Sequence, residues 1–147
     1  MKYLKLMAAS MLLILVSCNV EPEPINYNYD ECAYCKMKIA DIRFGAEMVT
    51  SKGKVHKYDS VECLVRTYIE NEKTKYAFII VTDYSQPHNL IDASSATFMI
   101  SEKQPSPMGG NLSAYQSKEH AEITLSEKGG KLLDFEGLVN EYRKTYQ

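Results

Sequence analysis

The alternation of hydrophobic and polar residues along the chain predicts short strands from residue 43 onwards. Arg43–Thr50 and Lys54–Tyr58 have the composition of two strands, and Ser51-Lys52-Gly53 between them is a hairpin signal in which glycine supplies the turn. Tyr76–Thr82 is a continuous run of β-prone residues, which is typical of a strand buried on both faces.

Between these strands, residues 59–70 predict a helix because apolar side chains recur at intervals of three and four residues. The apolar stripe consists of Val61, Leu64, Val65, Tyr68 and Ile69. Asp59 followed by Glu62 has the spacing of a capping box, so we expect the helix to begin at Asp59. Together these elements form one ββαβ unit.

The second half of the chain predicts the same order of elements less clearly. Its expected strands are Ala96–Ser101, Leu112–Tyr115 and Lys131–Asp134, with a Pro/Gly loop over Gln104–Asn111. Residues 117–128 fit either a helix closed by Gly129 or one arm of a hairpin, and we favour the helix.

A last amphipathic helix is expected after Asp134, which is its expected cap. Its apolar face consists of Phe135, Leu138, Val139 and Tyr142. The predicted fold class is therefore α+β, with two ββαβ-like half-domains in one small domain and no repeat visible at the level of residues.

The first 17 residues have the features of a lipoprotein signal peptide. Lys2 and Lys5 flank the start of an apolar run too short to span a bilayer, and Leu15-Val16-Ser17-Cys18 matches a lipobox. We expect residues 1–17 to be removed and Cys18 to carry the lipid that anchors a periplasm-facing domain, with the outer membrane as the expected location. The rival interpretation is an ordinary cleaved signal with an incidental cysteine.

Residues 18–30 have the composition of a flexible tether, with two prolines and no amphipathic period. This leaves residues 31–147 as a single domain. The precursor has a formal net charge of −2, and loss of Lys2 and Lys5 makes the mature chain −4. Because the sequence contains no basic patch, nucleic acid is disfavoured as a partner.

Cys32-Ala-Tyr-Cys35-Lys-Met37 places two thiols and a thioether within six residues. Such soft ligands select Cu(I) over hard cations and, where methionine takes part, over zinc. Disulfide formation, a redox-active CxxC pair and zinc binding remain open as alternatives. The absence of a helical stripe after Cys35 disfavours a thioredoxin-like dithiol, and the scattered histidines offer no second ligand pair for zinc.

Two further sulfur-bearing residues are candidate ligands. Met108 lies in Ser106-Pro107-Met108-Gly109-Gly110, where few apolar neighbours are available to bury it, whereas Met48 and Met99 lie in strand-like runs typical of a core. Cys63 falls opposite the apolar stripe in the first turn of its helix, where the helix dipole is expected to lower the thiol pKa. A second packed face explains Cys63 equally well. His56 is a weaker candidate on a hairpin arm.

Taken in order, these motifs resemble the NosL-type proteins, lipid-anchored copper chaperones that serve the assembly of nitrous oxide reductase. Besides the lipobox and the cysteine motif, the resemblance rests on Arg43-Phe44-Gly45-Ala46, Tyr58–Leu64, Val81–Tyr84, Ile91-Asp92-Ala93, Ala96 and Pro107–Ala114. The first half also resembles the short YHS/TRASH metal-binding modules. Lys36 departs from the pattern, because the family tends to have glycine at this position.

The resemblance implies a non-enzymatic Cu(I) carrier of the denitrification pathway, with nitrous oxide reductase and an ABC-type membrane complex as partners. It also implies a ββαβ pseudo-repeat distantly similar to organomercurial lyases. We predict that the metal site is drawn from Cys32, Cys35, Met37, Met108 and Cys63. The alternative from another functional class is a membrane-tethered thiol-disulfide oxidoreductase that uses Cys32 and Cys35.

Overall fold

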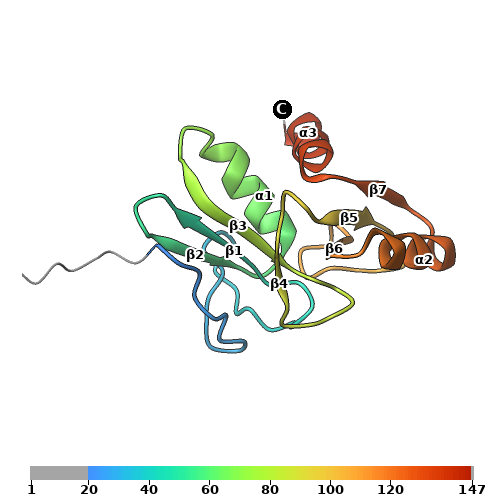
Figure 1. Ribbon diagram of the computed structural model, residues 1–147, viewed down its shortest axis with the longest axis horizontal. Coiled ribbons are helices and arrows are strands. Elements are labelled where there is room, and N and C mark those ends of the chain that lie inside the picture. The colour runs from blue at the N-terminus through green and yellow to red at the C-terminus, as the bar shows by residue number, and fades with distance from the viewer. Residues whose placement is uncertain (1–19, 147) are drawn as a thin grey trace, which may run out of the picture.

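The computed structural model describes residues 20–146 and arranges them in two antiparallel sheets and three helices (Figure 1). The predicted signal peptide and the predicted lipidation site at Cys18 lie outside these residues. None of the helices within residues 20–146 has both the length and the apolar character that crossing a membrane requires.

The first sheet has the strand order β2-β1-β3-β4, and α1 packs on one of its faces. Its elements are β1 (Ala46–Thr50), β2 (Val55–Tyr58), α1 (Val61–Glu70), β3 (Tyr76–Thr82) and β4 (Leu90–Asp92). The second sheet has the order β6-β5-β7. Its strands and the two remaining helices are β5 (Thr97–Ile100), β6 (Leu112–Tyr115), α2 (Lys118–Lys128), β7 (Lys131–Leu133) and α3 (Phe135–Tyr146).

The two halves share one topology, because β2-β1-β3 and β6-β5-β7 have the same order and each contains a helix before its last strand. The prediction of two ββαβ-like half-domains is therefore confirmed. The halves are joined where the end of β3 meets β6: Asp83 bridges to Ala114, and the Tyr84 N–H donates to the Ala114 carbonyl at 2.7 Å. A continuous core runs between them.

Several predicted boundaries require correction. The first strand begins at Ala46 rather than Arg43, because a turn precedes it in which the Phe44 N–H donates to the Asp41 carbonyl. β3 is buried only in its second half, from Ile80 onwards. The short strand β4 was not predicted, since three residues carry too little periodicity to be recognised.

The predicted capping box at the start of α1 is wrong. The N-cap is Ser60, and no side chain caps the helix. Glu62 instead receives a hydrogen bond from the hydroxyl of Ser106 in the loop before β6, and both side chains are buried. The Glu62 carboxylate, which the local spacing assigned to the helix terminus, is therefore used in a tertiary contact with that loop.

The other helix boundaries agree with the sequence. Ser117 caps α2 by accepting a hydrogen bond from the His120 N–H, and the helix ends at Gly129, whose φ is 71°. The helical alternative for residues 117–128 is thus confirmed. Asp134 caps α3 as predicted, with its Oδ1 accepting from the Gly137 N–H at 2.7 Å.

The predicted flexible tether over residues 18–30 is wrong for its second half, because the chain packs against the domain from Glu23 onwards. The Glu23 N–H donates to Glu47 Oε1 at 2.9 Å, and the Lys57 ammonium donates to the Pro24 carbonyl at 2.8 Å. Ile25 and Tyr27 pack against the core. Polar composition concealed these contacts, since each partner lies more than 20 residues away along the chain.

Gly45 allows this N-terminal segment to approach closely. A Cβ at Gly45 would lie 2.6 Å from the Tyr27 hydroxyl oxygen and 3.0 Å from Ile25 Cδ1. The Tyr27 hydroxyl lies 3.4 Å from Thr82 Oγ1 and the ring stacks edge-on against His88. Residues 23–30 therefore cover the face of the first sheet that α1 leaves open.

Candidate metal centre

The first two candidate ligands lie in a closed loop before β1, which we call the thiol loop (residues 31–38). Its ends pair at Glu31 and Lys38, the Cys32 N–H donates to the Met37 carbonyl at 2.8 Å, and the Lys36 N–H donates to the Cys32 carbonyl at 3.0 Å. The CxxC pair thus lies in a series of turns. It does not start a helix, which agrees with the sequence-based argument against a thioredoxin-like dithiol.

Lys36 adopts the left-handed conformation that the thiol loop requires, with φ of 65°. This conformation favours glycine, the residue that the resemblance leads one to expect here. The Lys36 ammonium donates to the Ala33 carbonyl at 2.7 Å, so the lysine side chain adds a second hydrogen bond across the same turn. The turn after Cys35 therefore forms with lysine in the glycine position.

The thiol loop is held between β2 and α1. The Ala33 N–H donates to the Lys57 carbonyl at 2.8 Å, which attaches the loop to the edge of β2. On the other side the Arg66 guanidinium lies over the Tyr34 ring, with 5.9 Å from its Cζ to the ring centroid. The loop is therefore held against α1, the helix that carries Cys63.

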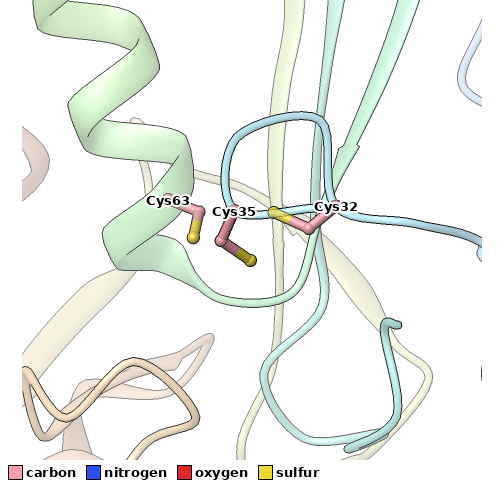
Figure 2. A group of neighbouring side chains, drawn as sticks. All are labelled: Cys32, Cys35 and Cys63. Atoms are coloured by element: carbon pink, nitrogen blue, oxygen red, sulfur yellow. The ribbon is translucent and has the colours of Figure 1, made fainter. Parts of the chain in front are cut away.

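This docking brings three thiols together. The sulfur atoms of Cys32, Cys35 and Cys63 all lie within 4.8 Å of one another, and Figure 2 shows the two loop side chains and the helix side chain converging. All three are free thiols. Cys32 and Cys63 are completely buried, whereas Cys35 is only half-buried. The cluster is therefore closed on one side and reachable from solvent at Cys35.

The spacing suits a single ion. An ion about 2.3 Å from three sulfur atoms in one plane requires sulfur–sulfur separations of about 4 Å. The observed upper limit of 4.8 Å leaves room for the small adjustment that binding entails. Among residues 20–146, no histidine or carboxylate joins the three cysteines within this distance. The cluster therefore offers three sulfur ligands.

The thiols differ in acidity. The pKa of Cys32 is lowered to about 5, because the Cys63 thiol and the backbone N–H groups of Asp59, Cys35 and Tyr34 donate hydrogen bonds to its sulfur. The pKa of Cys63 is raised by the neighbouring Cys32 sulfur and by burial. The predicted dipole-lowered pKa of Cys63 is thus wrong, since close negative sulfur outweighs a partial charge at the helix end.

A buried carboxyl group adds to the negative character of the site. Asp59 is almost completely buried, and burial together with the nearby Cys32 sulfur raises its pKa to about 6. The sequence reasoning missed this residue as a neighbour of the thiols and assigned it to the helix cap. The backbone amide of Asp59 and its carboxyl group both face the thiol cluster only because β2 ends beside the thiol loop.

The structure explains the burial of Cys63 by a second packed face. The whole first turn of α1, from Val61 to Val65, is buried, because the thiol loop and the loop before β6 cover the side turned away from the sheet. Cys63 therefore lies off the apolar stripe and is nevertheless completely buried. The second packed face that the sequence offered as an explanation is therefore confirmed, and the thiol cluster lies within it. The role of Cys63 as a metal ligand stays a prediction.

The two candidate methionines lie in different settings. The side chain of Met37 is exposed at the end of the thiol loop, and its N–H donates to the Cys35 sulfur. Met108 is half-buried against the core and lines a hollow of about 300 Å³ together with Arg66, Gly109 and Tyr142. The expectation that Met108 lacks packing partners is wrong. Its role as a ligand stays a prediction, as does that of Met37.

The remaining sulfur and nitrogen candidates fall outside the thiol cluster. Met48 and Met99 are completely buried core residues, as predicted. His56 lies on β2 and is half-buried, and its pKa is lowered by burial and by the charges of Lys54 and Lys36. It lines a separate hollow with Glu23 and is not among the clustered ligands.

Comparison with known proteins identifies the family of the chain. The sequence model of the NosL family matches residues 25–143. The chain belongs to the NosL family. The matched region contains all three clustered cysteines together with Met37 and Met108, whereas Cys18 precedes it. The match also begins within the N-terminal segment that packs on the sheet, in agreement with its place in the domain.

A solved structure shares the fold of this NosL-family chain. The crystal structure of the copper chaperone NosL from Shewanella denitrificans superposes with a TM-score of 0.69 at 24% sequence identity. The match covers 80% of this chain and 95% of that protein. At this identity the likeness establishes the fold. No curated protein is similar enough in sequence to count as a match.

Proposed function

We propose that this NosL-family chain is an extracytoplasmic, lipid-anchored Cu(I) chaperone that delivers copper for the maturation of nitrous oxide reductase. The observation that carries the proposal is the cluster of three free thiols, contributed by two elements far apart in sequence and within 4.8 Å of one another. Thiolate sulfur is a preferred ligand of Cu(I). Copper is the cargo of this protein.

The number and kind of ligands favour Cu(I) over zinc. Structural zinc almost always takes four protein ligands. Within residues 20–146 the three cysteines have no fourth partner among histidine, aspartate and glutamate side chains. An added soft ligand would be a methionine thioether. We propose Met37, at the end of the thiol loop, and Met108 for this role. Thioether ligands shift selectivity further towards Cu(I).

The uneven exposure of the thiols supports a carrier. Cys32 and Cys63 are completely buried and hold the ion on the side facing the core. The half-buried Cys35 and the exposed Met37 form the side accessible to solvent. A ligand from a partner can approach at Cys35 and replace it before the buried thiols release the ion. The site thus permits transfer by ligand exchange. Cu(I) keeps sulfur ligands at every stage and is not released into water.

The recipient and the membrane location rest on the family. The solved relative is described as a copper chaperone, and the NosL-type resemblance supplies nitrous oxide reductase as recipient and an ABC-type membrane complex as handover partner. The lipobox at Cys18 supplies the anchor and the periplasm-facing location.

The rival function, a thiol-disulfide oxidoreductase, fits the burial less well. A catalytic CxxC pair exposes its first cysteine as the attacking thiolate, because access controls the rate of exchange. Here the thiol with the lowered pKa is Cys32, which is completely buried. The acidic thiol is therefore available to a bound ion but not to a disulfide substrate.

The test is an anaerobic titration of the reduced chain with Cu(I) in the presence of a competing Cu(I) chelator. We expect the chain to withdraw one ion per molecule from the chelator, and the copper-loaded chain to activate copper-free nitrous oxide reductase. A chain that fails to compete for Cu(I) would contradict the chaperone proposal. Insulin-reduction activity that survives replacement of both methionines by leucine would instead favour the oxidoreductase.

A further inference from the structure

Four lysines gather at one end of the first sheet, although the sequence separates them into two turns. Lys52 and Lys54 lie in the turn between β1 and β2, and Lys73 and Lys75 lie in the turn between α1 and β3. The two turns are in contact, because the Ser51 N–H donates to the Lys75 carbonyl at 2.9 Å. We call these four residues the lysine end.

The charges of the lysine end are free to act on a partner. All four side chains are exposed, and within residues 20–146 none of their ammonium groups forms a hydrogen bond or an ion pair. The carboxylate nearest in sequence, Glu72, is paired with Arg143 at 2.6 Å. A chain with a formal net charge of −2 thus presents four unpaired positive charges at this end.

The described chain begins at this same end. Glu23 and Gly53, the latter in the turn between β1 and β2, line one shallow hollow. Figure 1 shows the blue start of the described chain beside this turn. Because residue 20 lies close to the packed Glu23, only a few residues separate the predicted lipid-bearing Cys18 from the domain surface. An extended residue spans at most about 3.6 Å, so the lysine end would lie next to the bilayer.

The thiol cluster lies at the opposite end of α1. Cys63 is in the first turn of this helix of 10 residues, whereas Lys73 and Lys75 follow its last turn. At a rise of about 1.5 Å per residue the helix separates the two ends by about 15 Å. A surface in contact with the lysine end would therefore lie at the far end of α1 from Cys63.

We propose that the lysine end binds the anionic phospholipid surface of the membrane and turns the thiol cluster away from it, towards soluble partners. The proposal rests on the proposed lipid anchor only for the way in which the domain reaches the membrane. Each basic residue close to an anionic bilayer strengthens binding by about fivefold, and salt weakens the attraction. The lipid anchor therefore attaches the domain to the membrane, and the contact of the lysines with the phospholipids orients the domain.

The test uses the mature chain, residues 18–147, with Cys18→Ser so that no lipid is attached. Sedimentation with vesicles is compared for phosphatidylcholine alone and for phosphatidylcholine with phosphatidylglycerol, at low and at high salt. We expect binding to the anionic vesicles at low salt only, and a loss of at least about tenfold in K52Q/K54Q and in K73Q/K75Q. The matched control K103Q/K118Q removes two exposed lysines of the second half and should bind like the parent.

The orientation of the domain on the membrane is tested in a second experiment. Because the chain contains no tryptophan, a single introduced tryptophan reports on its own position. Thr74→Trp places a fluorophore within the lysine end, and Ile123→Trp places one on exposed α2. We expect brominated anionic vesicles to quench the first and not the second. Equal binding to neutral vesicles, an equal loss in the control variant, or stronger quenching at residue 123 would each overturn the proposal. None of these results depends on Cu(I) binding, so failure here is distinguishable from failure of the chaperone proposal.

Discussion

The sulfur atoms of Cys32 and Cys63 lie within 4.8 Å of each other, although one residue belongs to the thiol loop and the other to α1. Both are completely buried. The thiol cluster therefore exists only when the thiol loop is docked against the helix. A ligand that binds the docked state alone stabilises it in proportion to the logarithm of its concentration over Kd, so Cu(I) should stabilise the whole domain.

Cys63→Ser tests whether the helix supplies a ligand. Loss of one of three sulfur ligands should reduce Cu(I) affinity by at least the roughly tenfold to hundredfold seen when outer-shell partners of metal sites are lost. Chelator competition measures the change, and circular dichroism confirms that the fold is retained. Cys18→Ser is the matched control, because that cysteine lies outside the family region, and its affinity should equal that of the parent. An unchanged affinity in Cys63→Ser would remove the helix from the site.

Met37→Leu and Met108→Leu test the proposed thioether ligands with little change in side-chain volume. Replacement of methionine by leucine usually destabilises a protein by less than about 1.5 kcal/mol, whereas Met108→Ala would also remove packing against the core. We expect weaker Cu(I) binding in both variants at nearly unchanged thermal stability. Core residue Met99→Leu serves as the control. If all three bind Cu(I) equally well, the site consists of the cysteines without the methionines.

Gly45→Ala tests the packing of the N-terminal segment. The added methyl group meets the Tyr27 hydroxyl and Ile25, so we expect a loss of about 1–3 kcal/mol in the free energy of unfolding and faster cleavage within residues 20–30 by protease. Tyr27→Phe removes the oxygen that lies closest to the new methyl group. It should therefore restore part of the loss when combined with Gly45→Ala, and no such rescue would show that the strain lies elsewhere.

Glu47→Gln tests a buried carboxyl group through its pH dependence. Burial raises the pKa of Glu47 above its ordinary value of 4.5, one carboxylate oxygen has no hydrogen-bond partner, and the other accepts from the Glu23 N–H. A raised pKa means that the folded state binds the proton more tightly than the unfolded state. This contribution to stability is therefore present below pH 4.5 and is lost as the pH rises through the folded pKa.

The variant carries no ionisable group at this position, so its stability relative to the parent should be highest near pH 7 and should decline as the pH falls towards 4.5. Denaturant unfolding at both values measures the difference. Exposed Glu127→Gln is the control and should show a difference that does not vary in this way. A constant difference for Glu47→Gln would mean that the carboxylate is fully compensated at neutral pH.

The local elements were largely predictable because their signals lie within a few residues of each other. The apolar stripe of α1, the glycine turn before β2 and the Asp134 cap of α3 each depend on short-range geometry, and all three are present. The capping box at Asp59 failed, although it is equally local. Its carboxylate partner Glu62 instead accepts a hydrogen bond from the Ser106 hydroxyl, which lies 44 positions away in the chain.

The sequence by itself determined the family, the order of the two ββαβ units and the soft chemistry of the Cys32–Met37 motif, because periodicity and ligand type are properties of neighbouring residues. Only the tertiary structure decided that Cys63 joins that motif and that Met108 packs against the core. It alone also showed that residues 23–30 cover the sheet. These facts depend on which surfaces meet across long stretches of chain, where burial and hydrogen bonding override local composition.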